Sequence, residues 1–156
     1  MQDCIDDLRS TIAAESVRLG SISDSAASLR PAPGKWSPKE IIGHLIDSAS
    51  NNHGRFVRAQ ISDDMVFEGY DQDAWVKLQR YNDRRWTDLL ALWQHYNAHI
   101  ASLIEGIAPD RLSLPRTRHN LDVVGWKTIP RDQPATLEYF IRDYVAHLKH
   151  HLSQIP

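Results

Sequence analysis

The chain has 156 residues, 42% of them apolar and 24% charged, a composition typical of one folded domain spanning residues 1–156. Its formal charge is −2 and acidic and basic residues are interspersed, so it lacks the basic stripe that nucleic-acid binding requires. No apolar run is long enough to cross a bilayer, and the acidic start is unlike a signal peptide. Cys4 is the only cysteine, which excludes an intrachain disulfide and a thiolate metal cluster. We therefore expect a cytoplasmic protein whose partners are small molecules rather than nucleic acid or membranes.

The first predicted helix runs from about Asp3 to Leu29. Apolar residues recur there at alternating spacings of three and four, which predicts a helix packed at a shallow angle in a bundle. Gly20 and the serine-rich stretch after it weaken the second half of this prediction.

The second predicted helix has the clearest start signal. Ser37-Pro38-Lys39-Glu40 offers an N-cap serine, a proline at the first helical position and a capping-box glutamate at the third. Apolar residues with helical spacing follow, and we expect the helix to end near Ile61, before the acidic Ser62-Asp63-Asp64.

Two more helices are predicted. One begins after Tyr81-Asn82-Asp83 and reaches about Glu105 or Gly106, and the other begins near Thr136, with an apolar stripe that continues to Ile155.

The connections between these helices are long. The segment from Ile107 to Ala135 is too long for a helix hairpin, so we expect it to cross the bundle or cover one of its ends. The segment from Ser62 to Asp83 contains Tyr70-Asp71-Gln72-Asp73-Ala74-Trp75, where a short helical turn is expected.

Three histidines predict a metal site. His147 and His151 are four residues apart, so on a helix both project from one face, in phase with Phe140 and Tyr144. His44 lies beside the apolar face of the second helix. Together the three would form a three-nitrogen site with open positions, the arrangement of catalytic rather than structural zinc. The alternative is that His44 is an ordinary hydrogen-bonded histidine and that the three are packing residues.

Helical phase separates the remaining histidines. His95 and His99 also have a spacing of four, but they lie opposite the apolar stripe of their helix and should face water. His150 is expected to be solvated. His53 and His119 are predicted to be surface or loop residues, and His119 is the better reserve ligand because loops can reach a site.

Four polar residues are candidates for roles beside the metal. Asp47 follows His44 by three residues and could orient a ligand or accept a proton, although a surface carboxylate is an equal alternative. Asn51 and Arg55 are candidates for binding a substrate carboxylate. Asn97 lies on an apolar stripe, where it lines a pocket or forms a hydrogen bond across the bundle.

The segment Trp36-Ser37-Pro38-Lys39-Glu40-Ile41-Ile42-Gly43-His44-Leu45 resembles the start of the second helix in DinB-like proteins, which include the YfiT-type candidate metalloenzymes. The segment from Tyr70 to Trp75, the pair Tyr96-Asn97 and the ending from His147 to Ile155 resemble the same family. The resemblance implies an all-α four-helix bundle with long connections, often dimeric, that holds a divalent metal on His44, His147 and His151. Zinc and nickel are both expected in such a site.

Family resemblance also favours a function. Members include S-transferases that use low-molecular-weight thiols, so a thiol-dependent S-transferase with a thiol cosubstrate is expected. Two alternatives stay open: a metal-dependent hydrolase that activates water, and a non-catalytic, metal-stabilised binding or dimerisation module. The last predicts a closed fourth position, filled by a carboxylate or His119.

Overall fold

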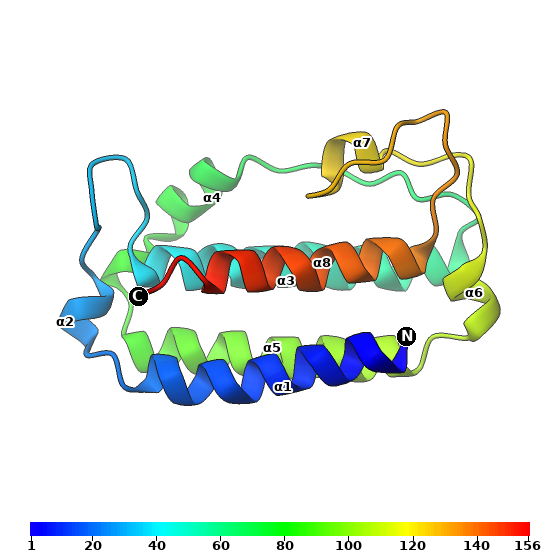
Figure 1. Cartoon of the computed structure of the whole chain (residues 1–156). Helices are drawn as coiled ribbons and strands as arrows, with labels where there is room; N and C mark the ends of the chain where they lie inside the picture. The colour runs from blue at the N-terminus through cyan, green and yellow to red at the C-terminus, as the bar shows by residue number, and fades with distance from the viewer.

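A computed structural model describes all 156 residues. Four long helices form the bundle: α1 (Gln2–Gly20), α3 (Pro38–Ile61), α5 (Trp86–Glu105) and α8 (Leu137–Leu152) (Figure 1). The connections contain α2 (Asp24–Ala27), α4 (Gln72–Gln79), the 3-10 turn η1 (Tyr81–Asp83), α6 (Pro109–Ser113) and α7 (Leu121–Val124). The only β pairing is two isolated bridges, Met65 with His119 and Arg116 with Ala135. No helix combines the length and apolar character needed to cross a bilayer. The predicted all-α four-helix bundle with long connections is therefore confirmed.

The order of the helices explains why the connection between α3 and α5 is long. α1 packs against α5 and α8, and α3 packs against the same two helices. In Figure 1, α3 and α5 both run from left to right, whereas α1 and α8 run from right to left. Because α3 and α5 are parallel neighbours, the chain must return along the whole bundle between them. It does so through α4, which packs on the outside of α3.

The start of α3 follows the capping signal in the sequence. The Ser37 side chain accepts a hydrogen bond from the Glu40 amide at 3.2 Å, and the Glu40 carboxylate accepts one from the Ser37 amide at 2.8 Å. Pro38 occupies the first helical turn and the helix ends at Ile61, as predicted. This capping box fixes where α3 begins, and hence the direction in which His44 projects.

The first helix is shorter than predicted, because α1 ends at Gly20 rather than near Leu29. The Ser23 side chain accepts a hydrogen bond from the Ala26 amide at 3.2 Å and so starts the separate helix α2. Serine side chains compete with the helical hydrogen-bond ladder in this way, which is why the apolar seam does not continue as one helix. In the last helix, the predicted apolar stripe extends beyond the helix itself. α8 ends at Leu152, although Ile155 is also buried.

The segment from Ile107 to Ala135 covers one end of the bundle and then one of its sides. α6 packs against α8 at the right-hand end in Figure 1, and the loop after α7 is bound to α8 through the Trp126 and Lys127 amides, which donate to Asp143. Arg116 is buried and donates a hydrogen bond to the Ala59 carbonyl near the end of α3, at 2.7 Å. The connection is therefore tied to the bundle rather than free in solution.

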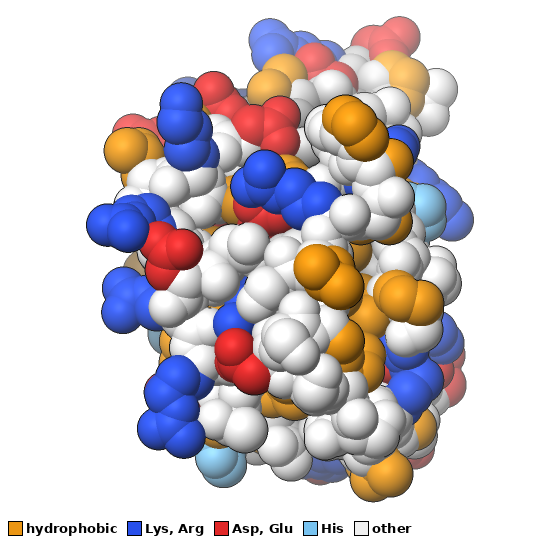
Figure 2. Space-filling view, turned by 90° about the vertical axis from the view of Figure 1, so that its left-hand side faces the viewer, with side chains coloured by type: hydrophobic (Ala, Val, Ile, Leu, Met, Phe, Trp, Pro, Cys, Tyr) orange, Lys and Arg blue, Asp and Glu red, His pale blue; other side chains and the backbone are white.

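The end of the molecule opposite α6, at the left in Figure 1, has a surface of mixed charged and hydrophobic side chains. Figure 2 shows acidic and basic side chains interspersed there, with hydrophobic ones between them. The charge pattern read from the sequence is thus retained on this face of the folded molecule.

Candidate metal centre

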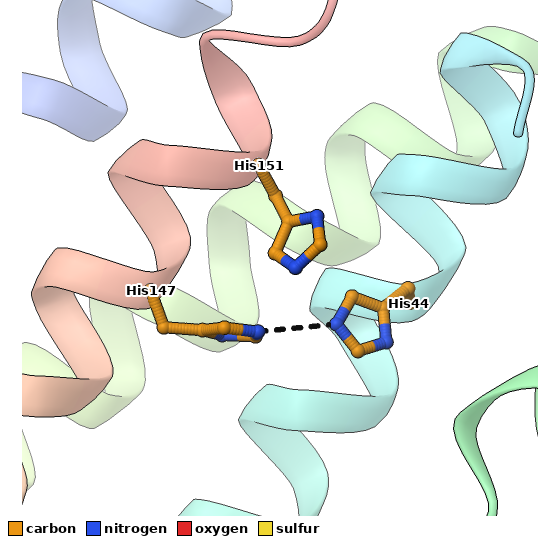
Figure 3. Close-up of side chains that lie close together, drawn as sticks. All are labelled: His44, His147 and His151. Atoms are coloured by element: carbon orange, nitrogen blue, oxygen red, sulfur yellow. Dashed lines mark hydrogen bonds between the residues drawn. The ribbon is translucent and has the colours of Figure 1, made fainter. Parts of the chain in front are cut away.

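The three predicted histidines meet between α3 and α8. His44 comes from α3, and His147 and His151 come from successive turns of α8 (Figure 3). The Nε2 atoms of His44 and His147 are 3.3 Å apart, and one ligand atom from each of the three rings lies within 4.8 Å of the others. The spacing of four residues on α8 thus places two imidazoles opposite the third, as helical phase predicts.

Burial keeps these imidazoles neutral. His44 is 1% exposed, and burial lowers its pKa to about 3, with a smaller contribution from the neighbouring His151. Burial likewise lowers the pKa of His147 to about 3 and lowers that of His151. A metal binds only the neutral form of imidazole. The three rings are therefore in the protonation state that a metal requires at neutral pH.

The donor set fits a divalent ion. Nitrogens bound to a tetrahedral ion at about 2.0–2.1 Å would lie roughly 3.3–3.4 Å apart, close to the separation between His44 and His147. Zinc, nickel and other borderline ions accept imidazole ligands of this kind. No carboxylate or fourth histidine belongs to the group, so the protein itself would supply three ligands. A three-ligand site leaves positions for a small molecule.

Aromatic rings hold the imidazoles in place. The ring centroid of Trp36 lies 5.0 Å from that of His44 and 6.3 Å from that of His151. Trp126 lies 6.1 Å from His147. The Nδ1 atoms of His44 and His151 are buried and have no hydrogen-bond partner. Packing, rather than the usual hydrogen bond from the second ring nitrogen, therefore orients these two rings.

A cavity of about 370 Å³ adjoins the three histidines. It lies between α3, α8 and the two connections that pass over them. Its lining includes two of the three histidines and side chains from α3, the α3–α4 segment, the loop after α7, and α8: His44, Ser48, Asn52, Arg55, Tyr70, Trp126, Phe140, Asp143, Tyr144 and His147. The three-histidine group therefore opens on a space of the size that holds small ligands.

Asp47 lies on α3 but is not among the residues that line the cavity. It is 3% exposed, so the alternative of a surface carboxylate is wrong. Its Oδ1 accepts hydrogen bonds from the Tyr81 hydroxyl at 2.6 Å and the Gln79 amide at 2.5 Å. Burial raises the pKa of Asp47, and these two hydrogen bonds oppose that rise. The observed contacts attach the α4–η1 segment to α3, while the catalytic role of Asp47 stays a prediction.

The three predicted substrate-binding residues are not brought together. Arg55 lines the cavity, whereas Asn51 and Asn97 do not. Asn51 donates to the Asp47 carbonyl at 2.9 Å. Asn97 is fully buried and accepts a hydrogen bond from the Tyr144 hydroxyl at 2.5 Å. Of the two predicted roles of Asn97, this is the hydrogen bond across the bundle. Asn97 thus contacts the cavity only through Tyr144, a lining residue.

The other histidines are apart from the centre. His95, His99 and His150 are exposed, as helical phase predicts, and His53 is half-buried beside the His99 ring. His119 is a loop residue, as predicted, but it is only 5% exposed. Its Nε2 donates to the Gln133 carbonyl at 2.7 Å and its Nδ1 accepts from the Leu121 amide at 3.2 Å. With both nitrogens in use, His119 is not a reserve ligand.

Several lining residues were missed in the sequence, among them Asp143, Tyr70 and Trp126. Asp143 lies one turn before His147 on α8, and this spacing of four could have identified it. Its two carboxylate oxygens accept hydrogen bonds from the amides of Trp126 and Lys127, both at 2.8 Å, which brings that loop over the cavity. Tyr70 and Trp126 come from irregular segments, where no periodicity indicates which way a side chain points.

Known proteins share this fold at low sequence identity. The family model of the DinB superfamily matches residues 8–155. A candidate metal-dependent hydrolase of Bacillus subtilis, YfiT, is 23% identical over 134 residues, covering 86% of this chain and 70% of that protein. The structure of YfiT, described as having an unusual four-helix bundle topology, superposes with a TM-score of 0.79 and 21% identity. The match covers 99% of this chain and 82% of that one. The chain therefore belongs to the DinB superfamily.

Proposed function

We propose that the protein is a metal-dependent enzyme, and that it is a thiol-dependent S-transferase with a low-molecular-weight thiol as cosubstrate. His44, His147 and His151 would hold a zinc or nickel ion. The observation that carries the proposal is the group of three neutral imidazoles beside a cavity of about 370 Å³. With this function we propose a cytoplasmic homodimer, on the family resemblance alone.

The charge of the site supports chemistry on an anionic sulfur. Three neutral imidazoles leave the charge of a bound cation uncompensated, and when bound such a cation would lower the pKa of a thiol or water at its open position. The chain's own part would be to limit the access of water to this point, to which Trp36 and Trp126 would contribute by packing against the imidazoles.

The carboxylates of the site favour a thiol over water as the nucleophile. Asp143 is the only carboxylate that lines the cavity, and both of its oxygens already accept backbone hydrogen bonds. A free thiol has a pKa of about 8.5, so a bound cation need lower it only slightly, whereas the pKa of water must fall from about 15.7 to near 7. A thiol therefore depends less than water on the cation and on a general base at this site.

A metal-dependent hydrolase is the second candidate, favoured by the name of the Bacillus subtilis relative. It would act in the same cavity on a substrate carrying a hydrolysable bond. A non-catalytic, metal-stabilised module is the third candidate, and it is weakened because neither a carboxylate nor His119 completes the group of ligands.

A paired assay separates these candidates. Zinc- or nickel-loaded protein would be offered glutathione, cysteine, coenzyme A, mycothiol or bacillithiol with an aryl-halide electrophile, and separately a set of ester and amide substrates. We expect thioether formation with at least one thiol and its loss in His147→Ala, with no loss in the matched exposed variant His150→Ala. Hydrolysis without thioether formation would contradict the S-transferase. Turnover of neither kind, with metal bound, would favour the non-catalytic module.

A further inference from the structure

One charge in the cavity lacks a counter-ion. Arg55 lines the cavity and is only 5% exposed, yet no carboxylate oxygen lies within 4.0 Å of its guanidinium. Asp143, the one carboxylate of the lining, is held by the amides of Trp126 and Lys127 instead. Buried charges in proteins are usually paired, because an unpaired one loses its hydration without compensation. Arg55 is therefore a buried cation that its own chain leaves unpaired.

The hydrogen bonds of Arg55 leave most of its donors free. Nη2 donates to the Glu68 carbonyl at 2.7 Å, and Nη1 makes a long contact of 3.4 Å with the Asn52 side chain. A guanidinium has five N–H donors, so these two contacts do not satisfy it. Arg116, the other deeply buried arginine, differs because carbonyls of Ala59, Arg111 and Leu114 surround it and it does not line this cavity.

A second donor is available beside Arg55. Tyr70 lines the same cavity, and its hydroxyl makes no hydrogen bond within the protein. Burial raises the pKa of Tyr70 to about 12, the charge of Asp47 adds to this rise, and the charge of Arg55 opposes it. The hydroxyl is thus protonated at neutral pH and able to donate a hydrogen bond.

These donors lie at a distance from the metal centre. His44, Ser48, Asn52 and Arg55 follow one face of α3 along the cavity. The eleven helical steps from His44 to Arg55 span about 16 Å along the helix axis. Between the two ends the cavity wall carries Phe140 and Tyr144.

We propose that Arg55 and Tyr70 form a carboxylate-binding subsite, so that the ligand of this cavity is an elongated molecule with an anionic carboxylate at the end remote from the three histidines. The fork of the guanidinium matches the two oxygens of a carboxylate. An apolar or aromatic middle section of the ligand would lie against Phe140 and Tyr144. The inference deepens the proposed function by naming the substrate class, but the subsite consists of the chain's own side chains and is testable without metal.

Calorimetric titration of chelator-treated protein at neutral pH tests the subsite. The probes are hexanoate and hexanamide, which have similar length and differ in charge. Wild-type protein is expected to bind the acid about 10- to 100-fold more tightly than the amide, the range for a charge-assisted hydrogen bond. Tyr70→Phe should reduce this preference, and Arg55→Gln should abolish it.

The control variant is Arg58→Gln, which removes the same charge from an exposed position one turn away on α3 and should retain the preference. Arg55→Lys guards against a folding effect, because it keeps the charge and should retain part of the preference. Equal binding of acid and amide by the wild type, binding of neither, or a preference that survives in Arg55→Gln would overturn the subsite. Since no metal or thiol is present, these outcomes are independent of whether the S-transferase proposal holds.

Discussion

His44 and His147 make the stability of the metal-free protein depend on pH. Their folded-state pKa values are about 3, well below the ordinary 6.5. As the pH falls below 6.5 the unfolded chain takes up protons that the folded chain refuses, so stability present above pH 6.5 is lost toward pH 3. The loss should reach at most about 1.4 kcal/mol per pH unit for each histidine.

Urea unfolding of chelator-treated protein between pH 7.5 and 5 measures this dependence. His44→Gln should flatten the slope, whereas the exposed-residue variant His150→Gln should leave it unchanged. A free energy of unfolding that stays constant over this range would contradict the burial of neutral imidazoles.

Asp47 and Tyr81 form a buried hydrogen-bonded pair, and its contribution to stability can be measured apart from any catalytic role of Asp47. Asp47→Ala should lower the free energy of unfolding by about 1–3 kcal/mol, because it leaves the Tyr81 hydroxyl without its acceptor. Tyr81→Phe added to Asp47→Ala should cost little more, since the orphaned hydroxyl is then gone. Additive losses of unfolding free energy in this double-mutant cycle would show that Asp47 and Tyr81 are not energetically coupled. Unchanged thiol transfer in the metal-loaded Asp47→Ala variant would remove Asp47 from the catalytic candidates.

At the scale of elements, the contact between α3 and η1 depends on a glycine. A Cβ atom added at Gly43 would lie 2.1 Å from Cδ2 of the Tyr81 ring, whereas one added at Gly54 would meet nothing closer than 3.8 Å. Both residues lie inside α3. Gly43→Ala should therefore destabilise the protein by about 1–3 kcal/mol through overpacking. Gly54→Ala should stabilise it by up to about 1 kcal/mol through helix propensity.

Thermal unfolding of the two glycine variants measures this difference on one helix. Equal effects would mean that the Tyr81 ring moves away at no cost and that the close approach is not a constraint.

The elements differ in how far the sequence predicts them, for physical reasons. The start of α3 was predicted because it depends on local chemistry, the capping box from Ser37 to Glu40, and its end near Ile61 was predicted too. The end of α1 was not, because an apolar seam continues past Gly20 while the Ser23 cap interrupts the helix. The loop after α7 carries no periodic signal, and its position over the cavity depends on Asp143, a tertiary contact.

At the scale of the whole molecule, the three-histidine group was predictable because two of its members share a helix and phase selects the third. The role of Arg55 was predicted from its residue type, but its lack of a counter-ion depends on the complete fold. Closeness in sequence does not predict the contacts of Asp47. It lies near His44 on the same helix, yet its hydrogen bonds go to Tyr81 and Gln79.

A bound ion should link α3, which carries His44, to α8, which carries His147 and His151, and so stabilise the whole molecule. Ligands that bind only the folded state add RT ln(1 + [L]/Kd), about 2.7 kcal/mol at 100 times Kd. Zinc or nickel added to chelated protein should therefore raise its melting temperature by several degrees. His151→Ala should reduce this shift and His95→Ala, an exposed histidine, should not. A shift equal in all three proteins would indicate binding elsewhere.

Metal content is the most direct measure of the central claim, that His44, His147 and His151 hold one divalent ion. Elemental mass spectrometry would be applied to untagged protein purified without added metal or chelator, beside His44→Ala, His147→Ala and the exposed control His150→Ala. We predict about one equivalent of zinc or nickel in the wild type and the control, and its loss in the other two folded variants. A wild-type protein that contains no metal and takes up none on titration would contradict the claim.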